Sequence, residues 1–113
     1  MVEPSPPIEI SCHDVQAEQA AGEPLRLIDC REPDEYAIVR LDGALHFPLS
    51  QLMARVGELA PYKDGQLVVF CHHGQRSLQM AEWLRRQGFA RVQSMAGGID
   101  RWAMEIDPGL ARY

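Results

Sequence analysis

The chain has 113 residues, of which 46% are hydrophobic and 24% are charged, and its formal net charge is −5. This length suits one compact domain and is too short for two, and the composition is that of an ordinary globular protein. The negative charge, without any run of Lys or Arg, argues against nucleic acid as the main partner. No apolar run approaches the roughly 20 residues that cross a membrane. We therefore expect a single domain that binds neither nucleic acid nor membranes.

The first residues and the cysteines bear on where the protein works. Residues 1–7 are acidic and proline-rich, without the basic start and apolar core of a signal peptide, and we expect a flexible tail there. The three cysteines, Cys12, Cys30 and Cys71, are odd in number and form no CxxC pair. This pattern favours reduced thiols over a disulfide framework, so we expect a cytoplasmic location.

Strand and helix patterns alternate after this tail. Short apolar runs predict five strands, at residues 8–11, 25–29, 44–47, 67–70 and 91–94. Apolar residues at helical spacing predict helices or helical turns at residues 13–21, 32–37, 49–56, 77–87 and 99–104. The alternation favours an α/β fold with a mainly parallel sheet and helices on both faces. We expect this domain to cover residues 8–106, followed by a tail at residues 107–113.

Cys71 lies where a thiolate can be used. It directly follows the apolar strand at residues 67–70 and opens a loop made of His72, His73, Gly74, Gln75, Arg76 and Ser77. Converging N–H groups in such a turn, together with a helix N-terminus, form a binding site for negative charge. These surroundings lower the pKa of a cysteine from about 8.5 and favour a catalytic thiol over a structural one.

The other loop residues are expected to bind an anionic substrate or to stabilise negative charge on the sulfur of Cys71. Gly74 lets the backbone curl around a bound atom. Arg76 either binds an anionic group at the mouth or holds the loop through a carboxylate, and the sequence leaves both open. Ser77 is expected to cap the helix rather than donate to the sulfur. His72 and His73 are expected near the mouth, as loop residues rather than as acid or base.

A second group of residues follows the strand at residues 25–29. We expect Asp29 and Arg31 to support the site, as a pair that fixes the loop between two strand ends. Cys30 is either a small packing residue or a resolving thiol that forms a disulfide with Cys71.

No cofactor and no metal are expected. Cys71, His72 and His73 are adjacent and cannot all turn onto one tetrahedral ion. The neighbouring pair Cys12 and His13 lacks matching partners in the sequence.

Four segments of the chain carry a family resemblance. They are LIDCREPDEY at residues 27–36, Gly43-Ala44 with Phe47-Pro48, CHHGQRS at residues 71–77, and Gly88-Phe89 with Gly97-Gly98-Ile99 and Trp102. Together they resemble the single-domain rhodaneses, a family of sulfurtransferases, over about residues 8–105. The resemblance implies a three-layer fold around a five-stranded mainly parallel sheet. It also implies that Cys71 carries sulfur as a persulfide.

The chain departs from this family at three points. IVRLD, at residues 38–42, replaces the usual Gly-His-Ile stretch, and Cys30 replaces an aliphatic residue. Where the mitochondrial type of thiosulfate enzyme carries Arg and Lys, this chain has His72 and His73. Imidazoles carry charge only in part at pH 7, so thiosulfate is expected to be a donor in the laboratory only.

The predicted function is transfer of a sulfane sulfur through Cys71, from a small sulfur-containing anion or a persulfide to cyanide, a thiol or a protein. Four residues separate Cys71 from Arg76, whereas cysteine phosphatases carry five, and the tighter loop favours sulfur over phosphate. The alternative is a protein-to-protein persulfide carrier or a regulatory rhodanese module.

Overall fold

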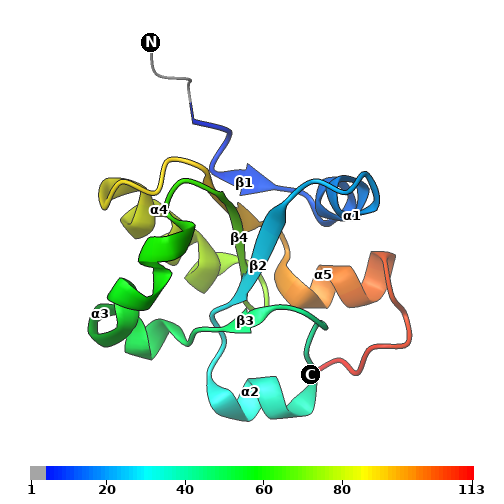
Figure 1. The fold of residues 1–113 in the computed structure, drawn as a ribbon. Coiled ribbons are helices and arrows are strands. Elements are labelled where there is room, and N and C mark those ends of the chain that lie inside the picture. Colours follow the sequence, from blue (N-terminus) through cyan, green and yellow to red (C-terminus); the bar gives the residue numbers. More distant parts are fainter. Residues whose placement is uncertain (1–4) are drawn as a thin grey trace.

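A parallel sheet lies at the centre of the structure, a computed structural model that describes residues 5–113 (Figure 1). In chain order its five strands are β1 (Glu9–Ile10), β2 (Leu25–Asp29), β3 (Leu45–His46), β4 (Gln66–Phe70) and β5 (Val92–Met95). In space they lie in the order β1-β5-β4-β2-β3, and every neighbouring pair is parallel. β4 is therefore the central strand.

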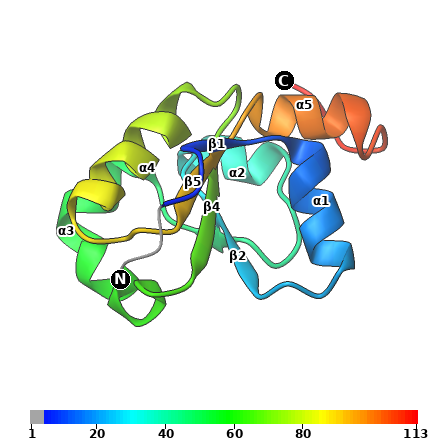
Figure 2. The same cartoon turned by 90° about the horizontal axis from the view of Figure 1, so that it is seen from above.

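Helices cover both faces of this sheet, as Figure 2 shows. One face carries α1 (Cys12–Ala20) and α5 (Gly98–Glu105), and the other carries α3 (Leu52–Arg55) and α4 (Gln75–Arg86). α2 (Pro33–Ile38) follows β2, and two 3-10 helices, η1 (Leu49–Gln51) and η2 (Val56–Tyr62), flank α3. This arrangement confirms the predicted α/β fold with a five-stranded parallel sheet between helices.

The residues of β4 alternate between two hydrophobic cores. Leu67 and Val69 pack into the core under α3 and α4, whereas Val68 and Phe70 pack into the core under α1 and α5. All four are at most 1% exposed. Burying one such side chain contributes about 1.5–3 kcal/mol, so β4 is anchored on both faces. This anchoring fixes the end of β4, from which Cys71 follows.

All ten predicted strands and helices occur, but one helical region is longer than expected. The sequence predicts a helix that ends at residue 56, whereas helical turns continue through η2 to Tyr62. Leu59, which is 1% exposed, ties this segment to the core. Gly57 and Pro61 lie within these tight turns, although in a sequence they are read as breaks.

The two predicted tails differ in how far the structure describes them. Most of the predicted tail at residues 1–7 lies outside the described residues, but the Pro7 carbonyl accepts a hydrogen bond from Gln93 at 2.9 Å. At the other end Arg112 pairs with Asp100 at 2.9 Å, and Figure 1 shows the C-terminus beside α2. The domain limits at residues 8 and 106 remain predictions. Across residues 5–113 no helix combines the length and the apolar character that crossing a membrane requires.

Candidate active site

Cys71 lies at the carboxyl edge of the sheet, directly after β4. The end of β2 lies beside it, because the N–H of Cys30 donates to the carbonyl of Phe70 at 3.0 Å. Both cysteine side chains belong to the core between the sheet and α4, and both thiols are free and buried. The two strand ends that the sequence singled out are therefore neighbours.

The first turn of α5 holds the loop from the other side. The N–H groups of Ile99 and Asp100 donate to the carbonyls of Cys71 and His72, at 2.8 and 3.1 Å. Gly98 permits this approach, since a Cβ there would collide with both carbonyls. Its φ of +62° also lies in the left-handed region that favours glycine. The loop is thus fixed through its backbone.

Hydrogen-bond donors surround the sulfur of Cys71. The Gly74 N–H donates to Sγ at 3.1 Å, the Ser77 N–H donates at 3.4 Å, and the Ser77 Oγ lies 3.5 Å away. Gly74 has a φ of +103°, which turns the chain from the loop into α4. The loop therefore has the geometry of an anion-binding nest around the sulfur.

The prediction that Ser77 caps the helix is wrong. α4 begins at Gln75, two residues earlier than expected, because the chain already turns at Gly74. Ser77 consequently lies inside the first turn, where its Oγ donates to the Gly74 carbonyl at 3.2 Å. The same hydroxyl lies 2.7 Å from the Oγ of Ser94 on β5. The hydroxyl lies 3.5 Å from the Cys71 sulfur, and donation from this hydroxyl to the sulfur stays a prediction because its proton is directed at the Gly74 carbonyl.

These surroundings lower the pKa of the Cys71 thiol to about 4. The largest contribution comes from the neighbouring Cys30 thiol; burial opposes it, and donors from Ser77 and Gly74 add to the lowering. Contact with Cys71 and burial raise the pKa of Cys30. At neutral pH Cys71 is therefore the thiolate, which is the nucleophilic form, and Cys30 is the thiol. The donors of the loop are predictable from the sequence, whereas the contribution of Cys30 is not.

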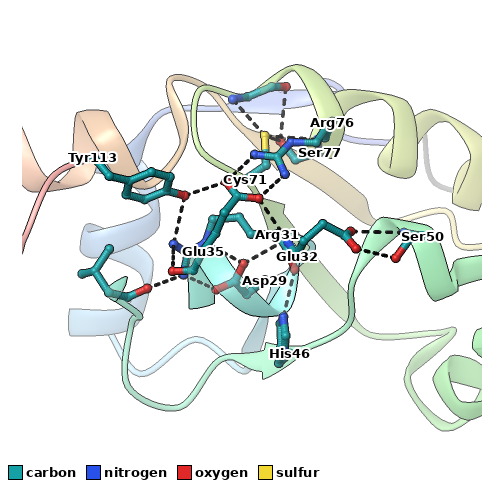
Figure 3. A network of polar contacts seen from close by, with 12 residues as sticks. Asp29, Arg31, Glu32, Glu35, His46, Ser50, Cys71, Arg76, Ser77 and Tyr113 are labelled. Carbon is teal, nitrogen blue, oxygen red and sulfur yellow. Dashed lines mark hydrogen bonds and ion pairs between the residues drawn. The ribbon is translucent and has the colours of Figure 1, made fainter. Parts of the chain in front are cut away.

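A carboxylate holds Arg76, which was one of the two alternatives left open by the sequence. The guanidinium donates to both oxygens of Glu35 on α2, at 2.5 and 2.8 Å (Figure 3). The Arg76 guanidinium is the main cause that lowers the pKa of Glu35 to about 2. The two side chains are 33% and 17% exposed, so this ion pair lies at the mouth of the site.

Tyr113 joins this network from the C-terminus, as Figure 3 shows. Its hydroxyl donates to Glu35 at 2.8 Å and accepts from Arg31 at 3.1 Å. Its ring stacks on His72, with centroids 3.9 Å apart. Burial is the main cause that raises the pKa of Tyr113 to about 12. Neither Tyr113, which belongs to the predicted C-terminal tail, nor Glu35, which belongs to the family motif, was predicted to be a site residue.

Asp29 and Arg31 form the predicted supporting pair below this network. The Arg31 guanidinium donates to both carboxylate oxygens of Asp29, at 2.9 and 2.7 Å, and both side chains are fully buried. Arg31 also donates to the backbone carbonyls of Glu35 and Val39. These hydrogen bonds offset the cost of burying two charges, and they tie α2 to the end of β2.

The remaining loop side chains lie at the surface of the site. His73 and Gln75 are exposed, and His73 meets the edge of His72 with ring centroids 3.9 Å apart. His72 is held between His73 and Tyr113, and its Nε2 is buried without a hydrogen-bond partner among the described residues. Both histidines are thus where the sequence predicts them, near the mouth.

The prediction that Cys12 and His13 lack a matching partner is wrong. Glu105 on α5 brings a carboxylate to them, and the three potential ligand atoms lie within 4.8 Å of one another. The Nε2 of His13 lies 2.8 Å from Glu105, and Arg101 pairs with the other carboxylate oxygen at 3.4 Å. Because Arg101 already balances this carboxylate, we assign no metal to the cluster.

The fold and the loop define a class of protein: a parallel α/β domain with a thiolate in a backbone nest after its central strand. The model of the rhodanese-like domain family matches residues 11–105. The chain belongs to this family, as the sequence motifs predict.

Individual proteins support the same assignment. The chain is 35% identical over 103 residues to a sulfurtransferase of Allochromatium vinosum, a match that covers 91% of this chain and 94% of that protein. It is 40% identical over 92 residues to the rhodanese-like/PpiC domain-containing protein 12, chloroplastic, of Arabidopsis thaliana; the match covers 78% of this chain but spans only 30% of that protein. Among solved structures, the human single-domain sulfurtransferase TSTD1 is similar with a TM-score of 0.77 at 27% identity, covering 88% of this chain and 98% of that one.

Proposed function

We propose that the chain is a sulfurtransferase that carries a sulfane sulfur as a persulfide on Cys71. The observation that supports this most directly is the pair of N–H donors, from Gly74 and Ser77, aimed at a buried sulfur with a pKa of about 4. A thiolate attacks sulfane sulfur, and a thiol of low pKa is also a good leaving group when the sulfur moves on. Membership of the rhodanese-like family supports the same chemistry.

The proposed reaction has two steps. First, the Cys71 thiolate attacks the outer sulfur of a donor such as thiosulfate; a new sulfur–sulfur bond forms, the donor's sulfur–sulfur bond breaks, and sulfite leaves with the electron pair. Second, a thiophilic acceptor attacks the terminal sulfur of the persulfide, and Cys71 leaves as a thiolate. The backbone donors of the nest stabilise the negative charge before and after each step. Neither step calls for a cofactor.

Two of the alternatives from the sequence, a persulfide carrier and a phosphatase, compare differently with this proposal, and a regulatory rhodanese module stays open. A persulfide carrier with a protein as acceptor uses the same intermediate on Cys71, so it differs from the proposed sulfurtransferase only in the acceptor. A phosphatase needs an arginine that is free to bind phosphate, whereas Arg76 already donates to both oxygens of Glu35. We therefore favour sulfur transfer over phosphate hydrolysis.

Intact-mass spectrometry after incubation with thiosulfate tests the proposal. We expect the wild type to gain the mass of one sulfur atom, and a reductant to remove it. Cys71→Ala should gain nothing, whereas the control Cys12→Ala, which removes a buried thiol next to α5, should behave as the wild type. A reducible gain that persists in Cys71→Ala would refute the assignment of the persulfide to this residue.

A further inference from the structure

Three arginines near the Cys71 loop are engaged by carboxylates. The ion pairs are Arg76–Glu35, Arg31–Asp29 and Arg112–Asp100. The last of them is tied to the loop, because the Asp100 N–H donates to the His72 carbonyl. Each pair has no net charge, so these arginines give the mouth of the site little excess positive charge.

Glu35 is the carboxylate that cancels the cation of the loop itself. It accepts two hydrogen bonds from Arg76, a third from the Tyr113 hydroxyl at 2.8 Å and a fourth from the Glu32 N–H at 3.2 Å. Figure 3 shows its carboxylate facing Arg76 and Tyr113 together. A carboxylate with four donors is held in one position, and the charge of Arg76 is neutralised where a donor molecule approaches.

The charge balance at the sulfur follows from this pairing. Cys71 contributes one negative charge as a thiolate, Arg76 one positive charge and Glu35 one negative charge, so the three groups sum to −1. Coulomb repulsion scales with the charge of the incoming molecule, so a dianion is repelled about twice as strongly as a monoanion. The site therefore suits donors that carry a single negative charge.

We propose that Glu35, held by Tyr113, is the residue that sets the charge selectivity of the sulfur donor, and that it favours singly charged donors such as alkyl persulfides or thiosulfonates over the thiosulfate dianion. Glu35 acts through Arg76 and is thus a positioning residue, not a catalytic one. This inference rests on the proposed sulfur transfer through Cys71.

Two small donors of similar shape isolate the effect of charge. Thiosulfate and methanethiosulfonate deliver the same kind of sulfur atom, and one oxyanion of the first is a methyl group in the second. In both reactions the Cys71 thiolate forms a bond to the outer sulfur and the donor's sulfur–sulfur bond breaks. Sulfite leaves with the electron pair in the first case and methanesulfinate in the second, so charge and atoms balance.

The experiment compares kcat/KM for these two donors in matched variants. In Glu35→Gln we expect the ratio of thiosulfate to methanethiosulfonate to rise about tenfold, because the charge of Arg76 becomes available to the dianion. In the double variant Glu35→Gln/Arg76→Gln the three-group charge returns to −1, and the ratio should return to within about twofold of the wild type. The control Glu58→Gln breaks the ion pair between Arg55 of α3 and Glu58 of η2 and should leave the ratio unchanged.

Ionic strength and Tyr113 give two further readouts. Added salt should raise kcat/KM for thiosulfate in the wild type, because it screens repulsion, and should raise it less in Glu35→Gln. Tyr113→Phe keeps the ring on His72 and removes one donor to Glu35, but it leaves the charges of Cys71, Arg76 and Glu35 in place, so it should move the ratio by less than about twofold.

The outcomes separate this inference from the proposed function. An unchanged donor ratio in Glu35→Gln, with turnover that still depends on Cys71, would overturn the role of Glu35 alone. A raised ratio that stays raised in the double variant would also overturn it, because charge would not be the cause. Turnover of both donors that survives in Cys71→Ala would overturn the proposed function itself.

Discussion

Replacing Cys30 by valine tests how the structure makes Cys71 a thiolate. The substitution keeps a side chain of similar volume in the core but removes the largest contribution to the lowered pKa of Cys71. A hydrogen bond to a charged atom is worth about 1.5–3 kcal/mol, and one pKa unit corresponds to about 1.4 kcal/mol. We therefore expect the pKa of Cys71 to rise by about one to two units from its value of about 4. At pH 5 the thiolate fraction should fall about twofold to tenfold, whereas at pH 7 it should change little.

The assay is the ultraviolet absorbance of the thiolate as a function of pH, taken as the difference between each variant and its Cys71→Ala counterpart. This difference removes the contributions of the other thiols, and a buried sulfur need not be accessible to a reagent. The rate of sulfur transfer at pH 5 and pH 7 gives a second measurement. A titration midpoint in Cys30→Val that coincides with that of the wild type would show that the nest donors alone set the pKa.

Further predictions concern stability, the mouth of the site and oxidation. The pKa of Cys71 is depressed in the fold, so its contribution to stability is complete above the unfolded pKa and is lost as the pH falls towards about 4. We expect the free energy of unfolding, measured with urea at several pH values between 5 and 8, to rise with pH more steeply in the wild type than in Cys71→Ala, by about 1.4 kcal/mol per pH unit. An equal pH dependence in the two proteins would contradict this. Gly98→Ala should lower the free energy of unfolding by about 2 kcal/mol or more, measured in the same way, because its Cβ meets two carbonyls. His73→Lys should lower KM for thiosulfate by about twofold to fivefold by adding a permanent charge at an exposed position, and an unchanged KM would place the imidazole away from the donor. After mild peroxide treatment, we expect peptide mapping to find sulfinic acid on Cys71 and an alkylatable Cys30, as for a packing and pKa-tuning residue. A cross-linked Cys30–Cys71 peptide would instead identify Cys30 as a resolving thiol.

The fold was predictable because its signals are local. Apolar runs and helical spacing identify the strands and helices, and the parallel arrangement follows from their alternation. The same local logic failed at η2, where Gly57 and Pro61 suggest a break. A buried Leu59 outweighs that signal, because tertiary packing decides the conformation of a short segment.

Of the candidate site, the sequence predicts Cys71 and its loop but not the contacts that distant residues make with the loop. Cys71 and the loop follow from a strand end and a glycine turn, both visible in consecutive residues. Glu35 lies 41 positions from Arg76 and Tyr113 lies 78 positions from Glu35, so their contacts depend on how the finished sheet brings α2 and the C-terminus together. Which of two neighbouring cysteines ionises also depends on three-dimensional donors, because only Cys71 receives the N–H groups of Gly74 and Ser77.

The contact between α5 and the loop determines which way two peptide planes face. In a trans peptide the N–H points opposite to the carbonyl. When the first turn of α5 draws the carbonyls of Cys71 and His72 towards itself, the N–H groups of His72 and His73 turn away from α5. The dipoles that line the loop are thus oriented by a helix that lies on the opposite side of the backbone. A small tilt of α5 would rotate these dipoles and change the electrostatic potential at the sulfur, although no side chain of the loop had moved.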